Sequence, residues 1–291
     1  MASNTLTVSC IIPAYNEGEA IREVVSEIQA VYPDFELIVV DDGSRDNTAE
    51  VAEQAGAKVI RHTYNIGNGA AVKTGIRNAT GDVIVMLDAD GQHPPNEIAR
   101  LLQHIGPYDM AVGARTSMSK VSKFRSFGNW GLIRIAEFLT GAEIPDLTSG
   151  FRAIKRDKVM EFIHLFPNQY SYPTTITMCM LKSGYFVKFV PMDSIRRREL
   201  GTSNIKPFRD GMKFINIMVR IIMLFDPQKV FLPLGSFCFL LGILIALVQI
   251  LTKLAVTGSA VMMVLSGLLI VLFGLVADQV AAVRREMSRL R

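Results

Sequence analysis

The sequence is poor in cysteine and histidine, and this argues against several kinds of functional site. Its three cysteines, Cys10, Cys179 and Cys238, lie far apart and form no metal-binding or redox spacing. They are therefore expected to be reduced residues that take part in packing. The four histidines form no metal cluster either. A zinc site, a disulfide framework and a thiol redox centre are not expected.

No signal peptide, internal repeat or low-complexity linker is visible in the 291 residues. The first apolar run after Met1 is short and soon meets Pro13 and Glu17, so it lacks the length of a secretory signal. The hydrophobic content of 49% nevertheless exceeds what a soluble core usually needs. This apolar excess must be located elsewhere in the chain.

Charged residues are absent from two long segments near the C-terminus, 230–251 and 255–277. Each is long enough for a helix that crosses the hydrocarbon core of a bilayer, which needs roughly 20 residues. A buried helical hairpin of a soluble protein is the alternative, but such helices normally carry a polar stripe. The segments therefore predict two spanning helices. The short connection at Thr252 and Lys253 makes them antiparallel neighbours.

Basic residues indicate which side of the membrane holds the rest of the chain. The connection holds only Lys253, whereas both outer ends are rich in basic residues, namely Lys206, Arg209, Lys213, Arg220, Lys229, Arg284, Arg285, Arg289 and Arg291. By the positive-inside rule the large N-terminal part and the tail are cytoplasmic. The expected parts are a cytoplasmic globular domain (1–205), an amphipathic juxtamembrane helix (206–228), two transmembrane helices (229–280) and a basic cytoplasmic tail (281–291).

The juxtamembrane segment has polar residues at spacings of three and four on an otherwise apolar helix. Such a helix lies either in the bilayer interface or inside the protein with its polar stripe exposed. Because it leads directly into the first spanning segment, the interface is favoured. A weaker pattern of the same kind covers 120–139.

The first hundred residues alternate β-rich runs with amphipathic helical stretches. Strands are expected at 8–12, 36–40, 58–61 and 82–87. This alternation predicts an α/β fold with a Rossmann-like, mostly parallel sheet and helices on both faces. The region from 115 to 205 is less regular and should complete the domain.

Acidic side chains follow three of these strands. Glu17 follows the first strand, Asp41 and Asp42 the second, and Asp88 and Asp90 the fourth. Ligands bind beyond the carboxyl ends of the strands in such sheets, so these clusters should meet at one edge.

Asp88 and Asp90 have the spacing of a metal site. As alternate residues at a strand end, they place their carboxylates on the same side of the chain. Gln92 adds a further oxygen, and Mg²⁺ and Mn²⁺ both prefer such ligands and often bridge them to substrate phosphates. A surface turn is the alternative for such a short pattern, but a turn does not require the preceding apolar strand.

Two other loops allow a functional and a structural interpretation. Asp42 could accept hydrogen bonds from a nucleobase or a ribose, or could lead into a capped helix at 48–54, and these two roles are compatible. Gly67 and Gly69 either let the backbone approach a ligand or form a tight turn before the next helix.

Six motifs in order resemble glycosyltransferase family 2, whose fold is termed GT-A. They are Pro13-Ala-Tyr-Asn-Glu17, Val40-Asp-Asp-Gly-Ser44, Asn65-Ile-Gly-Asn-Gly69, Asp88-Ala-Asp-Gly-Gln92, Asp146-Leu-Thr-Ser-Gly-Phe-Arg152 and Arg198-Glu-Leu-Gly-Thr-Ser203. The last two resemble the branch of dolichyl-phosphate mannose synthases and bacterial polyprenyl-phosphate glycosyltransferases. The resemblance covers about residues 8 to 215, and the two apolar segments are similar to those of bacterial members.

The resemblance implies a role for each matching residue. Donor-binding residues would be Pro13, Tyr15, Glu17, Asp41, Asp42, Gly67, Gly69, Asp88 and Ala89. Metal ligands would be Asp88, Asp90 and Gln92, with Mg²⁺ or Mn²⁺ as the cofactor. The acceptor phosphate would meet Arg115, Arg125, Ser126, Ser149, Arg152 and Arg198, of which Ser149 and Arg152 shape the acceptor loop. The residues counted as catalytic would be Asp90, Arg115 and Arg198.

Two departures from the wider family narrow the reaction. The Gln-x-x-Arg-Trp signature of processive polysaccharide synthases is missing, which argues against a polymerase. Where many members have an acidic general base, this chain reads Tyr170-Ser-Tyr-Pro-Thr-Thr175. A phosphate acceptor needs no such base, because with a second pKa near 6 it is already largely an anion. Arginine suits it, since its planar donors bind phosphate bidentately.

The expected activity is the inverting transfer of a sugar from a UDP- or GDP-linked donor to dolichyl or undecaprenyl phosphate. It would take place at the cytoplasmic face of a cell or endoplasmic-reticulum-type membrane. The resemblance also implies a homo-oligomer, with a tetramer as the candidate state, and no nucleic-acid partner is expected. A transferase acting on a lipid hydroxyl, such as diacylglycerol, and a non-catalytic membrane scaffold are the alternatives.

Overall fold

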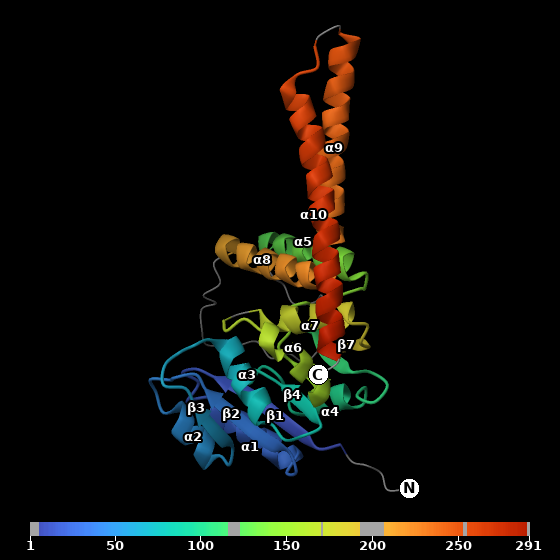
Figure 1. Ribbon diagram of the computed structural model, residues 1–291. Coiled ribbons are helices and arrows are strands. Elements are labelled where there is room, and N and C mark those ends of the chain that lie inside the picture. Colours follow the sequence, from blue (N-terminus) through green and yellow to red (C-terminus); the bar gives the residue numbers. More distant parts are fainter. Residues whose placement is uncertain (1–5, 116–122, 170, 193–206, 253–254, 290–291) are drawn as a thin grey trace. The chain divides into compact units, whose positions relative to one another are not determined.

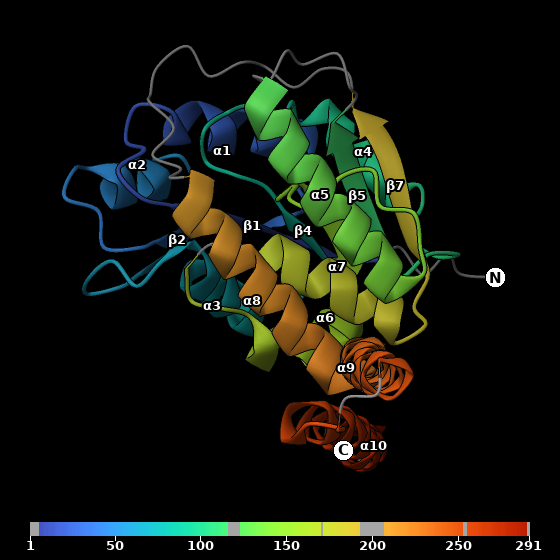
Figure 2. The ribbon, with the colours of Figure 1, turned by 90° about the horizontal axis from the view of Figure 1, so that it is seen from above.

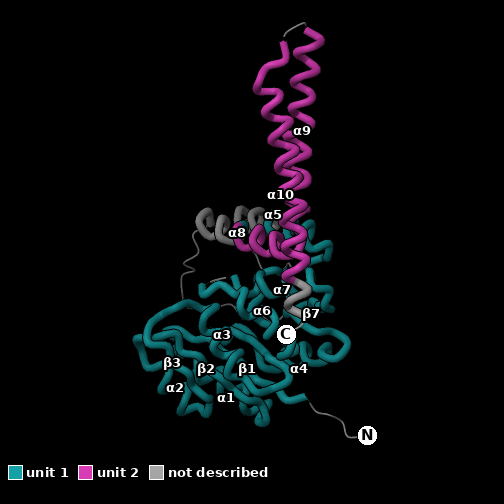
Figure 3. The backbone as a smooth tube through the Cα atoms, in the orientation of Figure 1, with its two compact units in different colours: residues 1–215 teal, residues 216–291 magenta. Residues whose placement is uncertain are grey.

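The computed structural model describes residues 6–115, 123–169, 171–192, 207–252 and 255–289, with side chains omitted at 123–130, 207–214 and 285–289. The chain divides into two compact units, residues 1–215 and 216–291 (Figure 3).

The first unit alternates strands and helices along its N-terminal half (Figure 1). Its described elements are β1 (Val8–Ala14), α1 (Ile21–Val31), β2 (Glu36–Asp41), α2 (Thr48–Gln54), β3 (Lys58–Arg61), α3 (Asn68–Asn78), β4 (Val83–Met86), α4 (Asn96–Leu102), β5 (Met110–Arg115), α5 (Lys123–Thr140), β6 (Arg152–Lys155), α6 (Arg156–Phe162), the 3₁₀ helix η1 (Ile163–Leu165), α7 (Tyr172–Lys182) and β7 (Val187–Met192). The four predicted strands are confirmed as β1 to β4, each to within two residues at either end.

The strands form one seven-stranded sheet in the order β3-β2-β1-β4-β6-β5-β7. All neighbours are parallel except β6, which runs antiparallel to both β4 and β5. The predicted mostly parallel sheet is therefore confirmed. The three strands after residue 109 were not predicted, because they lie in the region whose pattern is less regular.

Both faces of the sheet are covered by helices, as period-two alternation requires. Cys10 and Ile12 of β1 belong to a core cluster with apolar residues of α1, α2 and α4. Ile11 points the other way and contacts Gly75 of α3, where an added methyl group would overlap it. Figure 2 shows α1 and α4 on one side of the strands and α3 and α6 on the other. Cys10 and Cys179 are free and buried, as expected for packing residues.

The start of α3 packs against a distant segment, residues 167–169. Gly69 N donates to Gln169 O at 3.1 Å, and Ala70 N donates to Asn168 O at 2.8 Å. Gly67 has a φ of +123°, and an added methyl group there would lie 2.6 Å from Asn168 O. These glycines therefore permit close approach of the protein's own backbone.

The second unit contains most of α8 (Pro207–Phe225) together with α9 (Gln228–Leu251) and α10 (Gly258–Arg289). The predicted juxtamembrane helix and the two apolar helices are thus confirmed as helices. Helix α10 continues without a break through most of the predicted basic tail, residues 281–291. A good helix-forming sequence after the apolar run explains this continuation.

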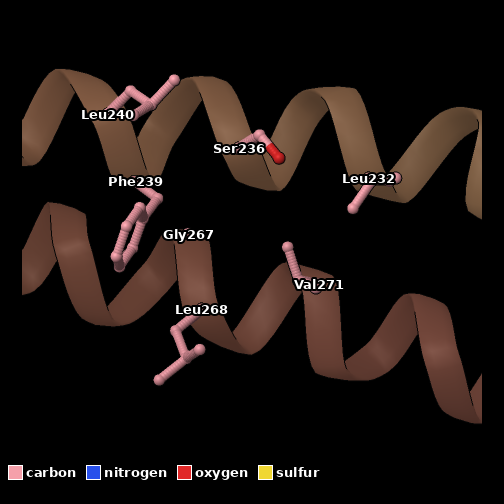
Figure 4. A pocket seen from close by; sticks show the side chains of 7 residues that line it. All are labelled: Leu232, Ser236, Phe239, Leu240, Gly267, Leu268 and Val271. Atoms are coloured by element: carbon pink, nitrogen blue, oxygen red, sulfur yellow. The ribbon is translucent and has the colours of Figure 1, made fainter.

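Helices α9 and α10 pack closely through glycines spaced seven residues apart. Gly235 and Gly242 of α9 lie against α10, and Gly267 and Gly274 of α10 lie against α9, each with a neighbour that an added methyl group would overlap. Small residues of this kind let helix backbones approach in apolar surroundings. Beside the contact lies an apolar groove of about 310 Å³ with one polar side chain, lined by Leu232, Ser236, Phe239, Leu240, Gly267, Leu268 and Val271 (Figure 4).

The two helices have the length and composition needed to cross a membrane. Most of their large apolar side chains are exposed, including Leu240 at 63% and Leu251 at 80%. Within this unit, the two helices therefore present a largely apolar surface.

Replacing Gly69 by Ala tests the packing of α3 against residues 167–169. The added methyl group would collide with the carbonyls of Pro167 and Gln169, the second at 2.7 Å. Overpacking of this kind costs about 1–3 kcal/mol of unfolding free energy, which lowers Tm by roughly 2–4 °C per kcal/mol. Thermal unfolding of the detergent-solubilised protein measures the change in Tm.

Gly131→Ala is the matched control. Gly131 lies within α5, and among the described residues no neighbour lies within 4 Å of the added methyl group. Its substitution should leave Tm unchanged or raise it slightly, because alanine is the better helix former. An equal loss of Tm in both variants would contradict the proposed role of Gly69.

Candidate active site

The sheet topology brings the functional motifs to one edge. Strands β1, β2, β4 and β5 are mutually parallel and end there, and the antiparallel strand β6 begins there. Arg152 at the start of β6 pairs with Met86 of β4 on one side and with Val112 of β5 on the other. The residues after β4 therefore face the loop before β6. The predicted convergence of acidic clusters follows from this arrangement.

Asp88 and Asp90 interact electrostatically at this edge. Burial and the neighbouring charge of Asp90 raise the pKa of Asp88 to about 6, and Glu17 adds to the rise. The arginines Arg115 and Arg152 act in the opposite direction. Two carboxylates this close destabilise each other's charge, and a divalent cation between them would remove that repulsion. The pair therefore fits a metal such as Mg²⁺ or Mn²⁺.

The loop after Asp90 is tightly turned. Gly91 has a φ of +68°, and Gln92 N donates to Asp90 Oδ1 at 3.1 Å. Ala89 is buried, and His93 stacks on Phe151 with ring centroids 4.7 Å apart. Burial lowers the pKa of His93, so its imidazole is neutral near pH 7. Among the described residues, no group of three or more His, Cys, Asp or Glu side chains could hold a metal. Gln92, substrate and water could supply further oxygen ligands.

Gly150 leaves space for Asp88. A methyl group on Gly150 would lie 3.2 Å from Asp88 Oδ2 and 3.3 Å from the hydroxyl oxygen of Tyr172. The loop before β6 and the start of α7 therefore both reach the metal motif.

Arg115 at the end of β5 forms a two-point ion pair with Asp146. Its Nε lies 2.7 Å from Asp146 Oδ2, and its Nη2 lies 3.0 Å from Oδ1 and 2.5 Å from Thr148 Oγ1. Although burial alone would raise the pKa of Asp146, the bonds from Arg115 hold it below its usual range. About half of the Arg115 side chain remains exposed, at 49%. The guanidinium is thus oriented by Asp146, on a side chain that is about half exposed.

Arg152 is fully buried and organises the backbone around it. Its guanidinium donates to the carbonyls of Ser149 and Pro173 and to Thr177 Oγ1. Burial lowers its pKa to about 10, so it stays charged at neutral pH. Ser149 is also buried, and its backbone N donates to Asp146 Oδ1 at 3.2 Å. Both residues shape the 146–152 loop.

Asp42 is held by the loop that follows β3. His62 Nδ1 lies 2.7 Å from Asp42 Oδ1, and the backbone N atoms of Ile66 and Gly67 donate to the same carboxylate at 3.0 and 2.7 Å. Asp41 is buried, accepts from Ser44 N at 2.9 Å and pairs with Arg61 at 3.1 Å. The two carboxylates thus fix the loops at the ends of β2 and β3.

The segment after β1 is attached to the same loops. Asn16 adopts a φ of +54°, its N donates to Ser44 Oγ, and its side chain accepts from Arg45 N, both at 2.9 Å. Pro13 is buried, and Tyr15 is 41% exposed. This turn places Glu17 close enough to Asp88 to raise its pKa.

Some predicted residues cannot be placed. Arg198 lies outside the described residues, and so do the side chains of Arg125 and Ser126. Conversely, the sequence did not single out Asp146 as the partner of Arg115, Tyr172 as a neighbour of Asp88, or His62 as the partner of Asp42. Asp146 begins one of the six sequence motifs, whereas no local sequence pattern marks Tyr172 or His62.

The arrangement can bind a cation and an anion close together. Asp88 and Asp90 attract a divalent cation, and Arg115 is within electrostatic reach of Asp88. An anionic group that binds the cation on one side would meet a guanidinium on the other. Such a site suits the transfer of a group between two phosphate-bearing molecules.

Two family profiles match the chain. "Glycosyl transferase family 2" matches residues 9–163, and "GtrB C-terminal hairpin" matches residues 226–283. The second match covers α9 and most of α10.

Similar proteins of known name agree with these family matches. A dolichol-phosphate mannosyltransferase from Pyrococcus furiosus is 36% identical over 69% of this chain and 60% of its own length. A polyprenol monophosphomannose synthase from Mycolicibacterium smegmatis is 32% identical over 67% of this chain and 79% of its own. An undecaprenyl-phosphate 4-deoxy-4-formamido-L-arabinose transferase from Pectobacterium carotovorum is 29% identical over 86% of this chain and 77% of its own length.

The fold is also similar to that of glucosyl-3-phosphoglycerate synthase from Mycobacterium tuberculosis, solved with Mn²⁺ and UDP-glucose. The TM-score is 0.58 at 19% identity, over 75% of this chain and 79% of that one. The predicted GT-A fold is thereby confirmed. Because the first profile spans more than half of the sequence, and relatives above 30% identity accompany it, the chain belongs to glycosyl transferase family 2 and is a glycosyltransferase.

Proposed function

We propose that this glycosyltransferase moves a sugar from a nucleotide sugar to the phosphate of a polyprenyl phosphate. The observation that carries the proposal is that Asp88 and Asp90 follow β4 at the same edge of the sheet where Arg115 ends β5, with its guanidinium held by Asp146. The named relatives support it, since they act on dolichol, polyprenol or undecaprenyl phosphates. Uridine and guanosine diphosphates are both compatible with the site as donor carriers.

Asp88, Asp90 and Gln92 would hold the cofactor, Mg²⁺ or Mn²⁺. When bound, the cation would neutralise the charge of the departing nucleoside diphosphate. Pro13, Tyr15, Glu17, Asp41, Asp42, Gly67, Gly69 and Ala89 belong to the loops that would surround the donor. The bonds that hold Asp41 and Asp42 preorganise these loops, which lowers the entropy lost on binding.

Arg115 would bind the acceptor phosphate, together with Arg125, Ser126 and Arg198. Its pairing with Asp146 fixes the guanidinium plane, so less side-chain entropy is lost when a phosphate binds. No strong base is required, because the acceptor phosphate is already an anion near neutral pH. Attack of its oxygen on the anomeric carbon, opposite the departing diphosphate, would invert that centre in a single displacement.

The apolar helices would place this chemistry at a membrane. Helices α9 and α10 would cross the bilayer as an antiparallel hairpin, and α8 would lie at the interface with its polar stripe toward water. A polyprenyl chain stays in the bilayer while its phosphate reaches the strand ends. The excess of basic residues at the outer ends of the hairpin favours a cytoplasmic catalytic unit.

Replacement of Asp90 by Asn tests the metal site. The substitution removes a charge that the cation needs, so turnover should fall at least about a hundredfold and Mn²⁺ affinity should fall with it. Release of nucleoside diphosphate from a panel of UDP- and GDP-sugars, with polyprenyl phosphate present, measures turnover. Unchanged turnover in the variant would contradict the metal assignment, and no activity of the folded wild type on any donor would contradict the proposed function.

Replacement of Arg115 by Ala tests the acceptor. Loss of a charge-assisted contact should lower kcat/KM for polyprenyl phosphate roughly 10- to 100-fold while donor affinity changes far less. Arg100→Ala is the matched control, because Arg100 also pairs with a carboxylate and a carbonyl, those of Glu97 and Pro191, but lies on α4. It should leave kcat/KM unchanged.

Two outcomes would point away from a phosphate acceptor. An enzyme that uses a lipid hydroxyl should retain nearly full activity in Arg115→Ala. If Arg115 only held the 146–149 loop, Asp146→Asn would reduce kcat/KM for polyprenyl phosphate as much as Arg115→Ala does. A milder effect of Asp146→Asn is expected.

Thiol labelling tests the orientation. In a Cys238→Ser background, a membrane-impermeant maleimide applied to intact cells should label Val256→Cys, which lies between α9 and α10, and not Phe186→Cys in the catalytic unit. Both native side chains are exposed, at 44% and 66%. Labelling of Phe186→Cys alone would reverse the proposed orientation.

A further inference from the structure

His62 joins three segments at the edge of the sheet where the sequence motifs meet. It directly follows β3, and its backbone N donates to Asp41 O at 2.9 Å. Its Nδ1 lies 2.7 Å from Asp42 Oδ1, just after β2, and its Nε2 lies 2.9 Å from Thr74 Oγ1, on α3. The ring therefore bridges the loop after β2 to the helix that follows β3.

Both ring nitrogens of His62 are engaged inside the protein. An ionised carboxylate can only accept hydrogen bonds, so Nδ1 carries a proton and donates to Asp42. In the neutral ring Nε2 then accepts from the Thr74 hydroxyl. Only 11% of the His62 side chain is exposed. Since neither nitrogen is left for a ligand, His62 can affect a bound molecule only through the groups that it holds.

Asp42 in turn holds the backbone of the loop between β3 and α3. Ile66 N donates to its Oδ1 at 3.0 Å and Gly67 N donates to its Oδ2 at 2.7 Å, and only 4% of its side chain is exposed. The terminal torsion of an aspartate has no sharp preference of its own, so its plane is set by its hydrogen bonds. The bond from His62 fixes that plane, which keeps both oxygens aligned with the two backbone donors.

The same loop packs against the loop after β2. Gly43 has a φ of +73°, and an added methyl group there would lie 2.6 Å from the carbonyl carbon of Tyr64. Strands β1, β2 and β3 are mutually parallel, so the loops that follow them lie at one edge of the sheet, where ligands of such folds bind. Residues 64–67 are therefore fixed at the place where a nucleotide would bind.

We propose that His62 is a positioning residue of the donor site, which holds Asp42 and, through it, residues 64–67 in the arrangement that binds the nucleotide. The inference rests on the proposed use of a nucleotide sugar. It assigns to His62 a role in nucleotide affinity and none in the transfer of the sugar. The Nδ1 bond to Asp42 carries this role, whereas the Nε2 bond to Thr74 orients the ring.

Two amide substitutions separate the two bonds of the ring. An asparagine amide has the length to donate from the place of Nδ1, whereas a glutamine amide reaches the place of Nε2. His62→Gln should therefore weaken nucleotide binding about tenfold, the effect of losing a hydrogen bond to a charged group, and His62→Asn should stay within about threefold of the wild type. Calorimetric titration of the full-length protein in detergent with UDP and, separately, GDP, in the presence of Mn²⁺, measures the affinity.

His104→Gln is the matched control. His104 lies between α4 and the start of β5, at the opposite edge of the sheet, where its ring meets that of Tyr108 with centroids 6.2 Å apart. The same change of side chain there should leave nucleotide affinity unchanged.

The outcomes separate the inference from the proposed function. Wild-type affinity in a folded His62→Gln, or an equal loss in His62→Asn, would overturn the inference and leave the nucleotide donor standing. If either variant does not fold, hydrogen exchange of the wild type decides. Residues 62–69 should be equally protected with and without nucleotide, and protection that arises only on binding would overturn the inference. A wild type that binds neither UDP nor GDP would overturn the proposed donor as well.

Discussion

The repulsion between Asp88 and Asp90 is the constraint around which the rest of the site is arranged. Burial, followed by the neighbouring charge of Asp90, raises the pKa of Asp88 to about 6. The positive charges of Arg115 and Arg152 limit this rise in the pKa of Asp88. Either a proton on Asp88 or a divalent cation between the two carboxylates would relieve this repulsion.

The two arginines that lower the pKa of Asp88, Arg115 and Arg152, have different surroundings. Arg152 is buried among backbone carbonyls, where it ties the start of β6 to α7 and lends its charge at a distance. Arg115 is held by Asp146 through two bonds and still faces solvent. A buried charge costs desolvation, which hydrogen bonds offset. The carbonyls of Ser149 and Pro173 and the Thr177 hydroxyl accept from the two terminal nitrogens of Arg152, whereas its Nε has no hydrogen-bond partner among the described residues. One arginine thus builds the site, and the other is available to a ligand.

Glycine has three separate uses in the chain. Gly67 and Gly69 admit the backbone of residues 167–169 against α3, and Gly150 leaves space for Asp88. In the C-terminal hairpin, glycines seven residues apart let α9 and α10 touch through their backbones. Each use depends on the absence of a side chain, yet only in the first does a positive φ matter, at Gly67.

The sequence by itself determined whatever depends on neighbouring residues. Alternation predicted β1 to β4 and long apolar runs predicted the two C-terminal helices, because both are local properties of the sequence. Only the tertiary structure decided which distant group satisfies each side chain. Antiparallel β6 lies between β4 and β5 and buries Arg152, Asp146 pairs with Arg115, and residues 167–169 cover Gly69. These pairings join segments far apart in the chain, so their energies depend on the packing of the whole sheet and leave no local pattern to read.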